Sequence, residues 1–132
     1  MKRKEHYCDR LSGLRLVMGT DDDQPIVAEI CTGFTPEGQL AITIDCYDYE
    51  DRCSDSSAII LVNPDDSRTM ARRNGVAHSD LPGFIADCLS EWREIVNANF
   101  REARDCFKEI TECLLDEGCR FRIERTPGRC IV

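Results

Sequence analysis

The chain has 132 residues, of which 42% are hydrophobic, so it can form one domain with its own core, and wholesale disorder is excluded. No segment approaches the ~20 consecutive apolar residues of a membrane-spanning helix. The basic start MKRKEHYCDR is not followed by the apolar segment of a secretory signal. We therefore expect a single cytoplasmic domain over 1–132 that does not contact a membrane.

The net charge of −8 is distributed unevenly along the chain. Residues 1–19 have a net charge of +3, and residues 67–132 carry eleven acidic and eleven basic groups. Residues 20–66 carry twelve acids against Arg52 alone, so the whole negative excess lies in this stretch of net −11. An acidic field of this kind repels nucleic acid and attracts basic protein surfaces.

The acidic half, residues 13–66, has the pattern of an antiparallel sheet. Apolar and polar residues alternate in the first three predicted strands, and the fourth (AIILV) is apolar on both faces, which indicates a strand covered on both sides. Turn-forming residues, such as TPEG, separate the strands. The pattern predicts a four-stranded meander. Its strands are 13–19, 26–34, 39–46 and 58–62.

The second half, residues 67–118, has a helical pattern. Asp66 or Ser67 is the expected cap of a short helix that ends at Arg73, and Ser79 or Asp80 is the expected cap of a longer one. The longer helix carries ten apolar residues at steps of three or four, which predicts one amphipathic helix over 81–117 with Gly118 just after its end. A break near Asn97 to Asn99 is the alternative. The ten residues are Leu81, Ile85, Leu89, Trp92, Val96, Phe100, Ala103, Phe107, Ile110 and Leu114.

The last segment, residues 119–132, is basic. Cys119, Phe121 and Ile123 alternate with arginines, and a Thr-Pro-Gly turn follows, so we expect a terminal strand or a small hairpin. The predicted fold is therefore α+β: a four-stranded antiparallel meander, one long or broken amphipathic helix, and a short C-terminal strand or hairpin.

The stretch IDCYDYEDRCSD, residues 44–55, is the most acidic candidate site. It fails as a calcium loop, because the fifth position counted from Asp48 is Arg52 and no glycine follows. Its two cysteines, Cys46 and Cys53, lie too far apart for a typical zinc pair, and a disulfide between them requires an oxidising compartment. We predict that this stretch ends a strand and forms an exposed acidic loop, with Cys46 pointing inward.

Nine cysteines are many for this length, but the chain contains no CxxC motif. In a reducing cytoplasm we expect free thiols that pack as small apolar groups. On one continuous helix Cys88, Cys106 and Cys113 would fall within ~20° of one another, at ~27 and ~10 Å spacings that are too long for a single metal ion. The sequence therefore predicts no metal and no cofactor; a cysteine-based zinc or thiol protein remains an alternative.

The sequence gives no support for an enzyme. It has two histidines, His6 and His78, and it lacks the GxSxG, Walker A and GxGxxG motifs. The C-terminal arginines are expected to lie on the solvent face of an edge strand rather than to bind nucleic acid, because the total charge is wrong for a phosphate binder. They are Arg120, Arg122, Arg125 and Arg129.

The acidic sheet favours a non-enzymatic inhibitor or adaptor that docks on a basic protein surface. Carboxylates two residues apart on a strand are ~6.6 Å apart, so they could imitate nucleic-acid phosphates, as in inhibitors of the anti-restriction or anti-CRISPR type. The alternative reading is that the acids only confer solubility. The predicted partner-binding residues are Asp21, Asp22, Asp23, Asp45, Tyr47, Asp48, Tyr49, Glu50, Asp51 and Asp55.

A second functional hypothesis is a helix-mediated assembly module, such as an immunity or chaperone-like protein. From Val96 the apolar residues follow steps of four and three over nearly three heptads, which could form a homodimer seam or hold a partner helix. The alternative is that the same stripe covers the domain's own sheet. The candidate interface residues are Val96, Phe100, Phe107, Ile110 and Leu114.

Overall fold

A computed structural model describes residues 11–21, 26–48 and 56–126. Within them the chain forms one five-stranded sheet whose order in space equals the order in sequence, and all neighbouring pairs are antiparallel. The α+β class is confirmed, and the sheet has five strands because the C-terminal strand pairs with the fourth. The strands are β1 Ser12–Gly19, β2 Ile26–Phe34, β3 Leu40–Asp48, β4 Ser56–Val62 and β5 Phe121–Thr126.

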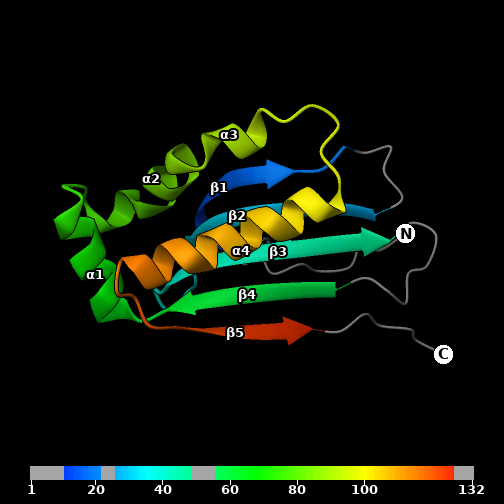
Figure 1. Cartoon of the computed structure of the whole chain (residues 1–132). Coiled ribbons are helices and arrows are strands. Elements are labelled where there is room, and N and C mark those ends of the chain that lie inside the picture. Colours follow the sequence, from blue (N-terminus) through cyan, green and yellow to red (C-terminus); the bar gives the residue numbers. More distant parts are fainter. Residues whose placement is uncertain (1–10, 22–25, 49–55, 127–132) are drawn as a thin grey trace.

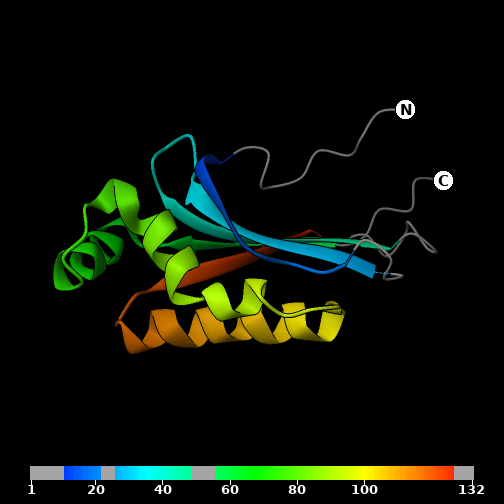
Figure 2. The ribbon, with the colours of Figure 1, turned by 90° about the horizontal axis from the view of Figure 1, so that it is seen from above.

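The helices follow β4 and return the chain to β5. Figures 1 and 2 show α2, α3 and α4 on one face of the sheet, with α4 running back beside α2 and α3. The helical elements are α1 Pro64–Arg73, the 3₁₀ turn η3 His78–Asp80, α2 Leu81–Cys88, α3 Ser90–Arg93 and α4 Phe100–Asp116.

The core lies between the sheet and these helices. Alternate residues of β3 and β4, among them Ile42 and Ile60, are fully buried on the helix side, against Leu81 and Ile110. On the other side of the sheet, Ala41, Ile59 and Leu61 form a smaller buried cluster with Leu11 packed against it. Strand β4 is therefore buried on both faces, as its apolar run AIILV predicts.

The chain does not form one continuous helix over 81–117. The alternative, a break near Asn97 to Asn99, is confirmed, and a second break lies at Leu89. Helix α2 ends at Cys88, the residue after it, Leu89, has a backbone φ of −110°, and a non-helical segment follows α3. Asn97 has a φ of +59°, which asparagine tolerates better than most residues, and Asn99 caps the next helix. A straight helix of ~55 Å would overshoot strands of nine residues, about 30 Å long, whereas a folded-back one covers the sheet twice.

The predicted cap of α1 is also corrected. The side chain of Asn63 accepts hydrogen bonds from the backbone amides of Asp65 and Asp66, so Asn63 is the cap, and Pro64 opens the helix. Asp66 instead binds Arg120 beside the start of β5, with 2.9 Å between its Oδ2 and the arginine Nε. At the start of α2, Asp80 occupies the predicted cap position but makes no side-chain cap bond.

Candidate functional site

Helix α4 is the element around which both candidate binding grooves are built. The side chain of Asn99 accepts from the amide of Glu102, and the Glu102 carboxylate accepts from the amide of Asn99, which forms a capping box. Gly118, at φ +76°, ends the helix as predicted, with its amide donating to the Leu115 carbonyl. One face of α4 is buried on the sheet, so its two flanks each border a groove.

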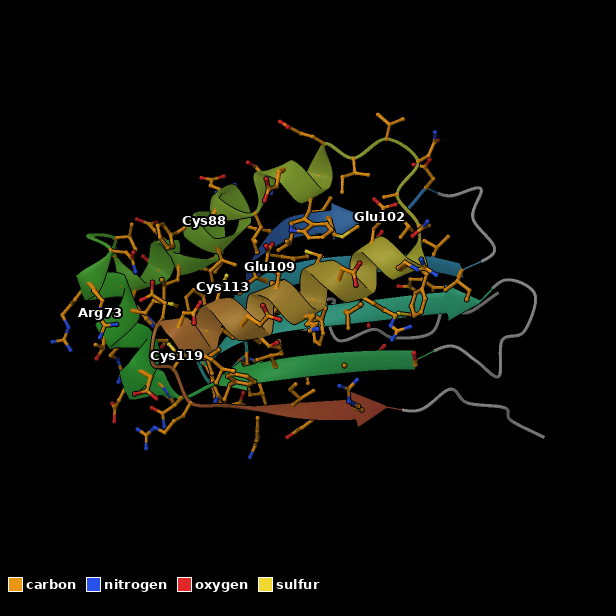
Figure 3. All side chains as sticks on the ribbon, viewed as in Figure 1. Arg73, Cys88, Glu102, Glu109, Cys113 and Cys119 are labelled. Atoms are coloured by element: carbon orange, nitrogen blue, oxygen red, sulfur yellow. The ribbon has the colours of Figure 1, made fainter. Side chains whose placement is uncertain are left out.

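The first groove lies between α1, α2 and α4 and has a volume of about 580 Å³. We call it the acidic cleft. Its apolar lining is Met70, Phe84, Ile85, Leu89, Ile110 and Leu114, and its polar lining is Arg73, Asn74, Cys88, Glu91, Glu109, Cys113, Asp116 and Glu117. Figure 3 shows Cys88, Glu109 and Cys113 where α2 and α4 face each other.

Four carboxylates face one guanidinium in the acidic cleft. The Nη1 atom of Arg73 lies 3.6 Å from Oε2 of Glu117. Glu109 accepts a hydrogen bond of 2.5 Å from the Trp92 indole. Glu91 and Asp116 are exposed and form no salt bridge within the described part of the chain. These two carboxylates are therefore the acidic groups of the cleft that a partner can reach at the lowest desolvation cost.

The cysteines of the cleft come from two helices, and this corrects the expectation that Cys88, Cys106 and Cys113 line one edge of a single helix. Cys106 is buried in the core, whereas Cys88 and Cys113 are exposed. Burial, followed by the charge of Asp87, raises the pKa of the Cys88 thiol. Burial, followed by the charge of Glu109, raises the pKa of the Cys113 thiol and brings that of Cys106 to about 12. Raised pKa values disfavour the reactive thiolate.

The part of the chain that the structure describes contains no assembled metal site. Within residues 11–21, 26–48 and 56–126, no three histidine, cysteine, aspartate or glutamate side chains are grouped so that they could hold a metal ion. Cys88, Cys106, Cys113 and Cys119 are free thiols, and Cys53, the residue considered as a disulfide partner of Cys46, lies outside the described ranges. The cysteine-based alternative therefore stays a prediction that rests on the cysteine count.

The second groove lies on the other flank of α4, above β3, β4 and β5, and has a volume of about 750 Å³. We call it the basic groove. Its apolar lining is Ile44, Cys46, Ala58, Phe100, Phe107 and Ile123, and its polar lining is Ser56, Ser57, Arg104, Asp105, Lys108, Thr111 and Arg125.

Three cations and one carboxylate line the basic groove. Arg104, Lys108 and Arg125 are exposed, and none of them forms a salt bridge within the described residues. The Arg104 guanidinium carbon lies 5.9 Å from the centre of the Phe100 ring, at the outer limit of a cation–π contact. The net charge of the groove lining is therefore positive, whereas the net charge of the whole chain is negative.

The predicted partner-binding residues of the sheet half are only partly described. Asp45 is corrected: it is 1% exposed and accepts a 2.6 Å hydrogen bond from Ser57, so it is a buried polar group rather than a surface charge. Asp21 and Tyr47 are half-buried, and Asp48 is the last residue of β3. The other predicted residues, Asp22, Asp23, Tyr49, Glu50, Asp51 and Asp55, lie outside the described ranges.

The strand ends on either side of these acidic segments lie at the same end of the sheet. Antiparallel pairing places Gly19 opposite Glu29, Ile26 opposite Asp48, and Cys46 opposite Ser56. Figure 1 shows the ends of β1 and β3 and the beginnings of β2 and β4 together. Three acids in 21–23 and four acids with one arginine in 48–55 are thus covalently attached at one end of the sheet.

The candidate helix interface is not available as a surface seam. Phe107, Ile110 and Leu114 are buried against the sheet within the chain itself. Val96 is 82% exposed, but it lies in the segment before α4 and not on the helix. The apolar stripe therefore covers the domain's own sheet, which is the alternative that the sequence left open, and a homodimer formed in another way stays a prediction.

The contacts of His78 indicate a structural role rather than a catalytic one. Its Nε2 lies 3.0 Å from Oγ of Ser67, a fully buried hydroxyl that also lies within 2.9 Å of the Pro64 carbonyl. Its ring centre is 5.2 Å from that of Phe34. Burial, followed by the charge of Arg68, lowers the pKa of His78. A buried serine cannot meet a substrate at the surface, so this pair gives no support for nucleophilic catalysis.

The C-terminal arginines are distributed over three environments. Arg120 binds Asp66, Arg122 pairs with Glu124 at 3.1 Å, and Arg125 lines the basic groove. Arg129 lies outside the described residues. Arg120, just before β5, and Arg122, on β5, are both engaged in ion pairs, so they do not form the continuous basic strip that a phosphate backbone requires.

Comparisons with protein-family models, with curated proteins and with solved structures gave no match. Among the helices of the described residues, none combines the length and the apolarity needed to cross a bilayer. The functional argument therefore depends on the geometry and charge of the two grooves.

Sequence reasoning missed both grooves, although a signal was present in α4. Glu109, Glu112 and Asp116 follow at steps of three and four on one flank, and Arg104 and Lys108 are four residues apart on the other. Summing charge over 67–132 gives zero and hides this separation.

Proposed function

We propose that this chain is a non-enzymatic binding protein that docks on a basic protein surface, and that the acidic cleft is the main contact. The observation that carries the proposal is the pairing of an apolar floor with the exposed carboxylates of Glu91 and Asp116. Apolar area supplies affinity, and carboxylates at the rim select a basic partner and accelerate its association.

The acidic end of the sheet supports the same function as a second contact. Seven acids are attached there through the ends of β1, β2, β3 and β4, and such a charge density suits a groove made for nucleic acid. An inhibitor or adaptor of a nucleic-acid-binding enzyme is therefore the partner class that we propose. Asp45 is not part of this contact, because its carboxylate is buried.

The test compares variants with equal changes of charge. Proteins from a nuclease-treated lysate are captured on immobilised wild type, on the cleft variant Glu91→Gln/Asp116→Asn, and on the control Glu37→Gln/Asp80→Asn, which neutralises two exposed acids outside the cleft. A basic protein captured by wild type and control is purified, and its dissociation constant is measured at low and high ionic strength.

We expect the cleft variant to bind this protein about tenfold more weakly and the control to bind within about twofold of wild type, since two rim charges over an apolar floor contribute ~1–2 kcal/mol. A third variant, Asp21→Asn/Asp22→Asn/Asp23→Asn, measures the sheet end. Loss of binding in this variant alone would move the contact from the cleft to the sheet. Equal affinity of all variants would overturn the proposal of acidic docking.

A further inference from the structure

The basic groove has a chemistry that the proposed docking function does not use. Its three cations, Arg104, Lys108 and Arg125, are exposed and form no salt bridge within the described residues, in a chain of net charge −8. Exposed lysines and arginines are common on protein surfaces, and alone they indicate nothing. These three, however, stand around an apolar floor rather than on a polar surface.

The floor of the groove is formed by the sheet and by the inner side of α4. Ile44, Ala58 and Phe107 belong to the core and show only their edges to the groove, and Ile123 of β5 is half-buried beside them. Arg104 and Lys108 come from α4, and Arg125 comes from β5 on the opposite side. A molecule on this floor would therefore have cations on two sides, and these three cations outnumber the one carboxylate of the lining, that of Asp105.

The polar groups at the mouth add directional contacts. The Ser56 side chain is half-buried at the beginning of β4, and no hydrogen bond engages its hydroxyl within the described residues. Ser57 differs, because its hydroxyl donates to Asp45 on the other face of the sheet. Ser56 can therefore donate to an anion, as can the two guanidinium groups, whose planar geometry suits carboxylate and phosphate oxygens.

We propose that the basic groove binds a small amphipathic anion, in which a carboxylate or phosphate head is joined to an acyl or aryl body. The body would lie on the floor beside Phe107 and Ile123, and the head would lie among Arg104, Lys108 and Arg125. The volume of about 750 Å³ is within the range of ~300–1,000 Å³ that small-molecule sites occupy.

The experiment uses 1-anilinonaphthalene-8-sulfonate, an aryl anion whose fluorescence rises in an apolar site. The full chain is titrated with this probe, and the bound probe is then displaced with dodecanoate, dodecyl phosphate or dodecylammonium. We expect one saturable site from which the two anions displace the probe at least tenfold more effectively than the cation. The two anions together distinguish a carboxylate from a phosphate head.

Charge variants locate the site. Lys108→Gln/Arg125→Gln removes two groove cations, and Arg72→Gln/Arg101→Gln removes two exposed cations that do not line the groove. We expect the first variant to bind the probe about tenfold more weakly and the second within about twofold of wild type. Ser56→Asp, which places a negative charge at the mouth, is expected to weaken binding as well. Circular dichroism and thermal unfolding verify that each variant is folded.

Three results would overturn this inference. The first is no saturable binding to the folded wild type, and the second is equal displacement by dodecylammonium and by the anions. The third is an equal loss of affinity in the groove variant and in the control variant, which would indicate a general effect of net charge. The acidic docking function is tested by other variants, so either proposal can fail while the other stands.

Discussion

The acidic cleft and the basic groove lie on the two flanks of α4, and their rims carry opposite charge. The cleft has Glu109 and Asp116 from the helix, whereas the groove has Arg104 and Lys108 from the same helix. With 3.6 residues per turn, residues three, four or seven apart share a flank, so one helix can present two charges to two neighbours. The net charge of a segment therefore says little about the surfaces that the segment forms.

The floors of the two grooves are formed by different elements. The charged side chains at their rims also differ in how far they are held in place by neighbouring groups. The cleft is closed by α1 and α2, and two of its rim carboxylates are engaged, Glu109 by Trp92 and Glu117 by Arg73. The groove is closed by the sheet, and its cations have no ion partner within the described residues. We infer that the cleft presents a more preorganised rim, whereas the cations of the groove must be ordered by what they bind.

The largest effect is expected from removing the packing that both grooves share. Ile110 is 2% exposed, belongs to the main core and also lines the cleft, so Ile110→Ala leaves a cavity under α4. We expect a loss of about 2–5 kcal/mol in the free energy of unfolding, measured by urea denaturation followed by circular dichroism. Binding affinity should fall at both grooves together, because both depend on the position of this helix.

Leu115→Ala is the control for this prediction. Leu115 lies on the same helix but is 64% exposed, so its truncation should change stability by less than about 0.5 kcal/mol. A cost below ~1 kcal/mol for Ile110→Ala, or equal costs for the two variants, would show that α4 does not pack on the sheet through this face.

Much of the fold follows from local sequence patterns. The alternation in 26–34 predicts the bounds of β2, because one side of an antiparallel sheet is covered by helices and period two is enforced there. The sequence leaves one continuous helix over 81–117 and a helix broken near Asn97 to Asn99 both open, and this ambiguity has a physical cause. A single stripe at helical spacing is compatible with one long helix or with two that fold back, and only tertiary packing decides between them. Asn97, within the break that the sequence offers as an alternative, permits the reversal, whereas the end of α2 before Leu89 is marked by neither glycine nor proline in the sequence.

The site could be predicted less well than the fold. Asp45 and Thr43 are two residues apart on β3, so they share the sheet face that the sequence predicts to be exposed. The Asp45 side chain is nevertheless buried and hydrogen-bonded to Ser57 of the next strand. Its burial depends on whether the sheet face away from the helices is also covered, and the alternation of apolar and polar residues does not indicate this. The acidic cleft needs residues of α1, α2 and α4 to meet, and single-sequence patterns give the elements without their arrangement.

A smaller effect is expected from removing the capping box of α4. This change should affect binding in the basic groove more than binding in the acidic cleft. Asn99→Ala removes the side chain that accepts from the Glu102 amide, at a cost of about 1 kcal/mol. The first two turns of α4 contribute Phe100 and Arg104 to the basic groove, whereas the cleft uses residues from Glu109 onward. Hydrogen exchange should therefore accelerate most at the start of α4, and probe binding in the groove should weaken more than docking at the cleft.

Asn97→Gly is the matched control for the cap. Glycine adopts the φ of +59° found at Asn97 without strain, so this change should alter stability by less than about 0.5 kcal/mol. An equal loss of protection at both ends of α4 in Asn99→Ala would mean that the helix opens as one unit, and the two grooves would then not be separable by fraying.

The smallest effect uses a thiol as a reporter of the charge in the cleft. The carboxylates of Glu109 and Asp116 add to burial in raising the pKa of Cys113. Asp116→Asn removes one of these negative charges, which lowers the pKa of the thiol and increases the fraction of reactive thiolate at any pH below it. Alkylation of Cys113 by iodoacetamide at about pH 8, followed by peptide mass spectrometry, should become about twofold faster, which corresponds to ~0.4 kcal/mol for an exposed pair of charges.

Asp105→Asn makes the same change of charge on the same helix, but Asp105 lines the basic groove and is not among the charges that act on Cys113. Its effect on the alkylation rate should be close to zero. The acceleration in Asp116→Asn should also disappear at a pH above the thiol pKa, where both proteins are fully thiolate, and it should shrink as salt is added. If both variants accelerate alkylation equally, Cys113 responds to the net charge of the chain, and the opposite charges on the two flanks of α4 would then not act as separate local fields.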